Sequence, residues 1–414
     1  MTTFGLFNTS VMGMSAQSDA LSSISENIAN SSTTGYKRAS AQFQTVLNTF
    51  GASDEFGGGV STSNRYDVQA QGAIQSTSSS TDIAIKGNGF FVVSDASGSI
   101  FLTRAGSFVP DTQGRLVNSS GFYLMGFPGK SAPTSSSTNA IAAMKVVKVT
   151  TDKLIAAPST SGALSANLPS NATTITGDLP SANTANSTYT QKTSLTTYDN
   201  LGNSVVLDVY YAKTGANSWE MTAYNSADAT GGGFPYASAA IGTSTLAFSA
   251  TDGSLSSGSP VSLTIPNGGT VSLDVSNTTQ LGASFAVTAA TVDGHAAGSV
   301  KQVTIAKDGT LDYQLDGGQN VPAYKIGLAN VNAPTFLSNA TGNVYSPTGE
   351  SGEIFVGAAQ TGGFGSIQSS SLEGSAVDLA TELSSMIVAQ RSYTANSQVF
   401  QVASDLLQVL NNLK

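Results

Sequence analysis

Cysteine is absent from this chain of 414 residues, and histidine and tryptophan occur once each, as His295 and Trp219. Without thiols the protein has neither disulfide bonds nor thiolate metal ligands, and this absence suits a cytosolic as well as an exported protein. A single imidazole and no paired-carboxylate motif leave little of the usual catalytic machinery. We therefore expect no catalytic site, no metal site and no cofactor.

Charged residues are also scarce. They make up 10% of the chain, against about 25% in ordinary soluble domains. Serine, threonine, alanine, asparagine and 43 glycines take their place. The net charge of -9 is spread along the chain, with no basic block that would release counterions from a nucleic acid, so nucleic-acid binding is not expected.

Long apolar runs are missing as well. None reaches the roughly 18 residues that a membrane-spanning helix needs. The first residues, MTTFGLFNTSVMG, lack the basic segment and the apolar core of a secretory signal peptide. We expect a protein that does not span a membrane and that, if exported, does not use a cleaved signal peptide.

Both ends of the chain carry apolar residues at helical spacing. From Val377 to Leu413 they alternate in steps of three and four, as in a coiled-coil seam, and a shorter stripe of the same kind runs from Val11 to Ile28. A helix of about 35 residues is about 50 Å long, and so narrow a stripe needs a partner helix from the other terminus or from a second copy. The residues expected to act in assembly are Leu21, Ile24, Ile28, Leu379, Leu383, Met386, Arg391, Tyr393, Phe400, Leu407 and Leu410.

Between the ends, short apolar runs alternate with turn signals such as Asp111-Thr112-Gln113-Gly114, which predicts antiparallel β-structure. We predict an α+β protein whose long terminal helices form a coiled coil, with two nested, mainly β domains between them. The expected parts are a terminal coiled-coil domain of residues 1–30 and 366–414, an extended linker arm at 31–75, an inner β-domain of 76–145 and 291–365, and an inserted outer β-domain of 146–290.

Three parts of the chain carry recognisable motifs. The first helix, expected to begin in the cluster at 8–10, ends in ANSSTTGYKR at 29–38, which by itself is typical of a helix end and a turn. TDIAIKGNGFFVV begins at Thr81 and TRAGSF at Thr103. The last helix is preceded by Leu-Glu-Gly and Val-Asp-Leu and contains Gln-Arg-Ser-Tyr. Together these motifs resemble the axial proteins of the bacterial flagellum, the rod, hook and hook-associated family, and within it the hook branch.

The resemblance implies a structural subunit of the flagellar hook, which self-assembles into a curved, flexible helical tube that transmits motor torque to the filament. It implies an extracellular location, a homo-oligomeric polymer, and contacts with rod, hook-cap and hook-filament junction proteins. The large insert at 146–290 and the turn at 197–203 favour the hook over the distal rod. The residues of the first motif that match the family are Asn30, Thr33, Gly35, Tyr36 and Lys37.

Phe7 and Val11 have two explanations. They resemble the Phe-x-x-x-hydrophobic element by which early flagellar proteins engage the type III export gate. They are also spaced as an i,i+4 apolar pair that closes the first turn of a helix. The export explanation would account for the missing signal peptide.

Other motifs have simple structural explanations. The Gly-Asn-Gly at 87–89 enters a strand and lacks a following Lys-Ser/Thr pair, so a tight turn is favoured over a phosphate loop. The loops at Asp199 and Asp308 lack the spacing of a calcium loop, so hairpin turns are favoured. Glu382, Arg391 and Asp405 are expected on a solvated or inter-subunit face, and Arg391 in its Gln-Arg-x-Tyr motif is expected to form an inter-helix hydrogen bond.

Two alternatives remain open. One is a distal rod or hook-associated protein of the same family. The other is a secreted carbohydrate-binding or enzymatic β-protein with oligomerising helices, because Tyr210, Tyr211 and Trp219 lie close in sequence and aromatic rings stack on sugars. For an assembling subunit we further expect the ends, roughly 1–70 and 365–414, to be disordered in the monomer and ordered in the polymer.

Overall fold

The computed structural model describes residues 3–49, 55–129, 138–150 and 153–412. The chain divides into two compact units. Unit 1 comprises Met1–Thr150, Gln302–Tyr313 and Pro322–Lys414, and unit 2 comprises Thr151–Lys301 and Gln314–Val321.

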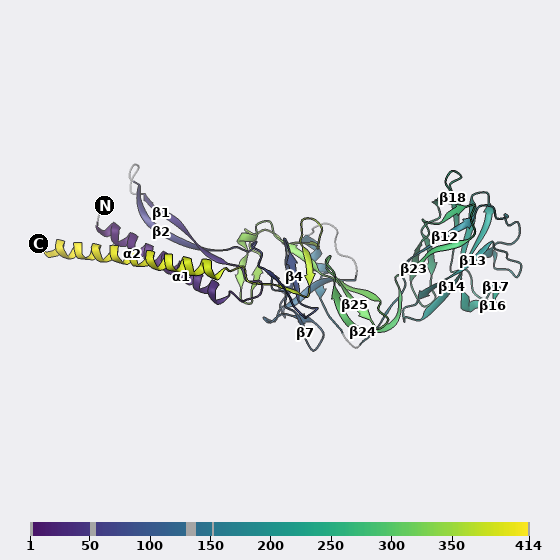
Figure 1. Ribbon diagram of the computed structural model, residues 1–414, viewed down its shortest axis with the longest axis horizontal. Coiled ribbons are helices and arrows are strands. Elements are labelled where there is room, and N and C mark those ends of the chain that lie inside the picture. Colours follow the sequence, from purple (N-terminus) through teal and green to yellow (C-terminus); the bar gives the residue numbers. More distant parts are fainter. Residues whose placement is uncertain (1–2, 50–54, 130–137, 151–152, 413–414) are drawn as a thin grey trace. The chain divides into compact units, whose positions relative to one another are not determined.

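Two α-helices from opposite ends of the chain lie side by side in unit 1, α1 (Thr3–Ala29) and α2 (Leu379–Asn412) (Figure 1). The start expected at 8–10 is wrong: α1 begins at Thr3, and Phe7 within its first turns packs on α2. The start of α2 follows its acidic residue as expected. The backbone N–H of Thr381 donates to the Asp378 carboxylate at 2.9 Å, which is an N-cap.

A long antiparallel hairpin runs along α1. It is formed by β1 (Ala39–Thr49) and β2 (Glu55–Tyr66), which are paired strands within the segment 31–75 that was expected to be an extended linker arm. The hairpin is tied to α1 through side chains, since Thr62 donates to Asp19 and Ser23 Oγ donates to Asn64 Oδ1 at 3.1 Å. Its sequence is polar and rich in glycine like a loop, and the strands are held by their mutual ladder and by these contacts.

The β-structure of unit 1 is centred on β5 (Phe90–Ser94), which is completely buried. This strand pairs with β6 (Ile100–Thr103), β9 (Tyr123–Pro128) and β27 (Gly327–Asn330), so the sheet combines segments from before and after unit 2 in sequence. The other elements of unit 1 are β3 (Ile74–Ser76), β4 (Ile83–Lys86), β7 (Val109–Pro110), β8 (Leu116–Val117), η1 (Thr138–Ala143), β10 (Lys145–Val146), η4 (Pro334–Phe336), β28 (Ser338–Ala340), β29 (Val344–Ser346), β30 (Phe355–Ala358), β31 (Ser366–Ser369) and β32 (Ser371–Glu373).

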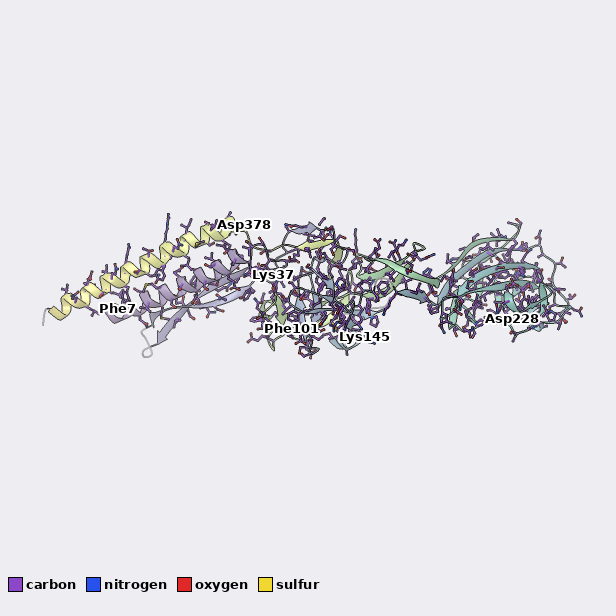
Figure 2. The ribbon with its side chains drawn as sticks, turned by 90° about the horizontal axis from the view of Figure 1, so that it is seen from below. Phe7, Lys37, Phe101, Lys145, Asp228 and Asp378 are labelled. Atoms are coloured by element: carbon purple, nitrogen blue, oxygen red, sulfur yellow. The ribbon has the colours of Figure 1, made fainter. Side chains whose placement is uncertain are left out.

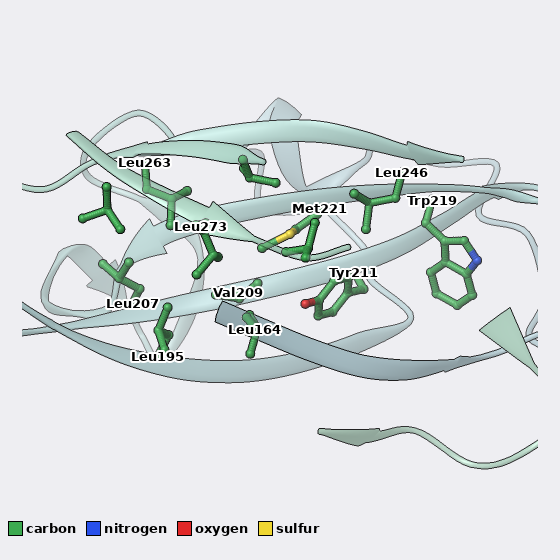
Figure 3. Packing of buried hydrophobic residues seen from close by; sticks show 14 of the residues in the cluster. Leu164, Leu195, Leu207, Val209, Tyr211, Trp219, Met221, Leu246, Leu263 and Leu273 are labelled. Carbon is green, nitrogen blue, oxygen red and sulfur yellow. The ribbon is translucent and has the colours of Figure 1, made fainter. Parts of the chain in front are cut away.

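Unit 2 buries its core between two sheets (Figure 3). The first sheet has the order β13 (Gln191–Tyr198), β14 (Ser204–Gly215), β15 (Ser218–Asn225), β18 (Gly242–Phe248), β19 (Leu255–Ser257). The second has the order β20 (Val261–Thr264), β21 (Thr270–Asp274), β12 (Ser161–Pro169), β22 (Thr279–Leu281), and β23 (Ala286–Val292) also pairs with β12.

A few further elements complete the chain. Unit 2 also holds β11 (Leu154–Ala157), η2 (Pro180–Ala182), η3 (Ser226–Asp228), β16 (Ala229–Thr230) and β17 (Gly233–Tyr236). Three strands lie at or across the boundaries between the units: β24 (His295–Ile305), β25 (Thr310–Leu315) and β26 (Asn320–Lys325).

One five-residue turn recurs in both units, at 95–99, 111–115, 118–122 and 199–203. In each, the first residue is Asp or Asn and its side chain accepts the backbone N–H groups two and four residues later. The fourth residue is a glycine with positive φ, which other residues rarely adopt. The sequence pattern Asp/Asn-x-x-Gly therefore marks hairpin ends, including the turn expected at Asp199.

The described residues are mostly β-structure with one helix at each end. The predicted α+β class is confirmed. Coiled-coil packing and the expected domain boundaries stay predictions.

Candidate assembly site

Small side chains line the contact between α1 and α2. Ala389 and Ala403 of α2 are buried, as are Ala16 and Ala20 of α1. Near the free ends of the pair, the rings of Phe7 and Phe400 meet edge to face with their centroids 4.9 Å apart. Figure 2 shows Phe7 at the end of the pair away from Lys37 and Asp378. These contacts let the two helices approach closely and place the aromatic pair at one end.

The residues predicted for assembly lie on more than one face of the pair. On α1, Ile24 is buried and Leu21 and Ile28 are half-buried. On α2, Met386 and Phe400 are half-buried, and Phe400 meets Phe7 of α1. In contrast, Leu379, Leu383, Tyr393 and Leu407 keep between 38% and 49% of their surface exposed, and Arg391 is exposed. The side chain of Leu410 lies outside the described residues. The predicted stripe is therefore only partly the α1 contact.

The actual contact on α2 runs instead through Glu382, Ala389, Phe400 and Ala403. A second line of apolar residues on α2 faces solvent. We call it the outer stripe, and its described members are Val388, Ala395, Val399, Val402, Leu406 and Val409. Its valines and leucine are between 46% and 61% exposed. Exposed apolar surface of this extent is typical of a protein interaction site.

A cluster of three buried charged side chains lies at the base of the helical pair, the end where α1 ends and α2 begins. We call Lys37, Arg104 and Glu373 the charge cluster. The Glu373 carboxylate accepts from Lys37 Nζ at 2.5 Å, from Arg104 at 3.2 Å and from the backbone N–H of Gly72 at 3.0 Å. The side chains of Lys37 and Glu373 are fully buried and that of Arg104 is 3% exposed. One carboxylate thus joins segments that lie far apart in the sequence.

The charge cluster holds two cations for one anion. Burial lowers the pKa of Lys37, and Glu373 opposes this shift through its charge and its hydrogen bond. Burial likewise lowers the pKa of Arg104, again opposed by Glu373. Since the desolvation of buried ions is costly, the carboxylate of Glu373 is what allows both cations to stay inside.

Gly35 lies where the three motif segments meet. Its backbone N–H donates to the carbonyl of Glu373 at 2.8 Å, and its φ is +68°. A methyl group there would come within 2.7 Å of the backbone of Arg104 and Ala105. Only glycine fits at position 35, where the chain passes so close to the backbone of Arg104 and Ala105.

The other matching residues of the first motif end α1 and hold the next segment. Asn30 Nδ2 donates to the carbonyl of Glu26 at 2.9 Å, and Thr33 Oγ1 donates to Asn30 Oδ1 at 3.0 Å. The Tyr36 hydroxyl donates to Asn27 Oδ1 at 3.2 Å. The motif is thus both a helix end, as its sequence alone indicates, and a junction.

The expectation for Glu382 is wrong. This residue was expected on a solvated or inter-subunit face, but its side chain is fully buried. Asn27 Nδ2 donates to Glu382 Oε2 at 3.1 Å, and the guanidinium of Arg38 forms an ion pair with the same carboxylate. Asn27 also makes two hydrogen bonds to the backbone of Ala39, which starts β1. A carboxylate on α2 is thereby linked to α1 and to the hairpin.

Sequence reasoning did not assign a role to Asn27, Arg104 or Glu373. Arg104 and Glu373 stand inside the motifs TRAGSF and Leu-Glu-Gly. Only 10% of the residues are charged, so it was notable that Lys37, Arg104 and Glu373 each lie within a motif. This pattern could have predicted that the three side chains form one cluster. Nothing in the sequence pointed to Asn27, because the helical spacing was analysed for apolar residues and Asn27 is polar.

The aromatic residues considered for sugar binding are internal. Trp219 and Tyr211 are fully buried in the core of unit 2 (Figure 3). Tyr210 is 1% exposed and belongs to a neighbouring cluster of buried tyrosines. The indole N–H of Trp219 donates to Gln280 Oε1 at 3.0 Å. These rings have no free face on which a sugar stacks.

Within the described ranges, no group of three or more His, Asp or Glu side chains is placed to hold a metal ion. Neither described helix is long and apolar enough to cross a membrane.

Four protein families match parts of the chain. Flagella basal body rod protein matches residues 7–37, the Flagellar hook protein FlgE/F/G D1 domain matches 84–177, the Flagellar basal body protein FlaE D2 domain matches 167–295, and the Flagellar basal body rod FlgEFG protein C-terminal family matches 368–413. The matches cover both helices and much of the β-structure.

Relatives match over the whole chain. The flagellar hook protein FlgE of Brucella suis biovar 1 (strain 1330) is 42% identical over 100% of both chains, and that of Rhizobium meliloti (strain 1021) is 43% identical over 100% of both. The flagellar hook protein FlgE of Escherichia coli (strain K12) is 33% identical over 99% of this chain and 100% of its own. A solved structure, the Helicobacter pylori flagellar hook protein FlgE2, aligns with a TM-score of 0.45 and 14% identity over 71% of this chain and 99% of that one. The chain therefore belongs to the flagellar hook protein family.

Proposed function

We propose that this hook subunit polymerises through its helical pair into a curved, flexible tube that transmits torque from the motor to the filament. The observation that carries the proposal is the outer stripe of α2, whose valines and leucine stay about half exposed in a single copy. Full burial of an exposed Val or Leu side chain contributes about 1.5–3 kcal/mol, so covering the exposed half contributes about half of that for each residue. A polymer supplies that burial, and a lone subunit does not.

The composition supports flexibility elsewhere in the tube. A rotating curved tube requires each row of subunits to lengthen and shorten once per turn, so some contacts must exchange easily. Surfaces of Ser, Thr, Asn and Ala with few charges form weak polar contacts that water replaces at little cost. We propose that the parts 76–145 with 291–365, and 146–290, take the outer positions in the tube, and that the coiled-coil ends 1–30 and 366–414 take the innermost.

The remaining finer assignments are also proposals. We infer contacts with rod, hook-cap and junction proteins, and export through the type III gate with Phe7 and Val11 as the signal. Val11 is 46% exposed, whereas Phe7 packs on Phe400. The two explanations of this pair are thus compatible, because a chain in transit has not yet formed the helical pair. We propose no enzymatic activity.

The test is electron microscopy of hooks made by a strain whose subunit lacks residues 377–414. We expect no tubes, because the deletion removes α2 and with it the outer stripe. A subunit carrying Leu201→Ala, which changes an exposed turn residue of unit 2, serves as the expression control. Normal tubes from the deletion strain would contradict the proposed role of α2. Straight, stiff tubes from the unaltered protein would favour the distal rod alternative instead.

A further inference from the structure

A groove lies between α1, β1 and the first half of α2. Its volume is about 390 Å³. Small side chains line it, among them Ala20, Ala41 and Ser385. Phe43 of β1 and Val388 of α2 also line it and are 49% and 61% exposed. The lining thus combines small side chains with two exposed apolar ones.

One cation reaches this groove. Arg38 is among its lining residues and its side chain is 38% exposed, although one nitrogen is paired with the buried Glu382. No other Lys or Arg is among the described residues that line the groove. The groove is therefore lined by small apolar and hydroxyl side chains, with one cation, Arg38, and one anion, the buried Glu382 with which it is paired.

The last turns of α2 continue beyond its ring contact with Phe7, and of the described side chains there only Ala403 is buried. Phe400 meets Phe7, which is only four positions after the described start of α1 at Thr3. Beyond this contact α2 continues to Asn412 with Val402, Leu406 and Val409 about half exposed or more. We call residues 402–409 the overhang. Its one charged residue is Asp405, which is exposed.

We propose that the overhang of one copy packs into the groove of the next copy. This inference rests on the proposed polymerisation and names the surfaces that carry it. The occupant fits in two respects: Val402, Leu406 and Val409 offer exposed apolar side chains, and Asp405 offers a second carboxylate to the partly exposed Arg38, whose Nε pairs with Glu382. The outward face of α1 is a poorer partner for the overhang, since it presents serines, Ser15, Ser18, Ser22 and Ser25.

The two surfaces lie at different levels on the same helix. Val388 at the groove and Leu406 in the overhang are 18 residues apart, or about 27 Å at about 1.5 Å per residue. A contact between two different surfaces is heterologous, and repetition without closure gives an open helical stack. The pairing therefore yields a filament, which a symmetric contact between two copies of α2 would not.

The chain contains no cysteine, so engineered thiols report this contact directly. Ser385→Cys places a thiol in the groove and Leu406→Cys places one in the overhang. Tubes assembled from a mixture of the two variants are oxidised, and we expect disulfide-linked dimers that contain one subunit of each kind. Tubes of either variant alone should give at least tenfold less dimer. Ser25→Cys mixed with Leu406→Cys is the matched control and should also give little.

The outcomes separate this inference from the proposed function. Self-crosslinking of Leu406→Cys alone would overturn the groove pairing in favour of a contact between two overhangs. Tubes that form normally without mixed dimers would also overturn it and would leave polymerisation intact. If the unaltered protein never forms tubes, the proposed function fails and the inference fails with it.

A second measurement uses the assembly equilibrium. Leu406→Asp should raise the concentration at which tubes form by tenfold or more, while Gln408→Asp, an exposed position outside the outer stripe, should change it less than threefold. The fluorescence of Trp219 reports that unit 2 of each variant is folded. Equal effects of the two substitutions would overturn the inference.

Discussion

Unit 2 has a core of large apolar side chains that its own two sheets cover: Trp219, Leu207 and Leu246 are fully buried there. In α2 the valines and leucine of the outer stripe remain about half exposed. The two parts differ in how completely each covers its own apolar side chains. Unit 2 has an interior of its own, whereas the helical pair has one covered face, one tightly held base at the charge cluster, and one face that needs another copy.

The first way to sharpen this comparison is to remove the anion of the charge cluster. Glu373→Gln leaves Lys37 and Arg104 buried without a counter-charge, and we expect it to destabilise unit 1 by about 3–5 kcal/mol. Thermal unfolding followed by circular dichroism measures the loss, and the transition reported by Trp219 in unit 2 should not move.

Two further variants complete this test. Glu350→Gln, at an exposed position, should change stability by less than about 0.5 kcal/mol. The double variant Lys37→Met with Glu373→Gln should lose less than the sum of the single variants, because the two charges are coupled. Additive losses would argue against a shared cluster.

The second prediction tests the interior of unit 2. Leu246 lies opposite Trp219 on neighbouring strands and is fully buried. Leu246→Ala should cost about 2–5 kcal/mol, measured by urea unfolding with Trp219 fluorescence. Leu201→Ala, at a position 72% exposed, should cost less than about 0.5 kcal/mol. Similar costs for the two would mean that unit 2 is not closed as described.

The third prediction concerns two tyrosines of unit 2. The hydroxyl of Tyr211 is buried and has no hydrogen-bond partner among the described residues, and burial raises its pKa. Tyr211→Phe should therefore be neutral or stabilising by up to about 1 kcal/mol. Tyr224→Phe should instead lose about 1 kcal/mol, because the Tyr224 hydroxyl donates to the carbonyl of Pro180 at 2.8 Å. The order of the two urea midpoints decides the prediction.

The smallest expected effect is at the start of α2. The backbone N–H of Thr381 donates to Asp378 and lowers the pKa of its carboxyl below the usual 3.8. A carboxyl with a lowered folded pKa stabilises fully above its unfolded pKa, and the stabilisation is lost as the pH falls through the folded pKa. The helix signal of assembled protein should thus fall at acid pH.

Asp378→Asn keeps an acceptor for the cap without a titrating group. Its helix signal should fall less than that of the unaltered protein between about pH 5 and pH 2. Identical acid profiles for the two proteins would show that the cap does not contribute.

Much of this organisation was predictable from sequence. The 3–4 spacing predicted both terminal helices, the Asp/Asn-x-x-Gly turns marked hairpins, and the three motifs indicated the family. The face of α2 that contacts α1 was not predictable. Apolar residues at helical spacing follow Leu379, Val388 and Ala389 along three different sides of this helix. Spacing alone does not say which side meets α1.

The hairpin and the buried carboxylates were missed for a different reason. Residues 39–66 are polar, and their strands depend on side-chain contacts with α1, such as Asn27 with Ala39, that no local pattern shows. Glutamate side chains are usually exposed, so the sequence predicted a surface position for Glu382. Its burial follows from Asn27 and Arg38, which approach it only in the folded chain.

The most direct test of the central claim is the accessibility of the outer stripe before and after assembly. Val402→Cys introduces the only thiol of the chain, and its rate of alkylation is measured in free subunits and in tubes. We predict a rate at least tenfold lower in the tubes, because another copy covers the stripe. Equal rates in the two states would contradict the account.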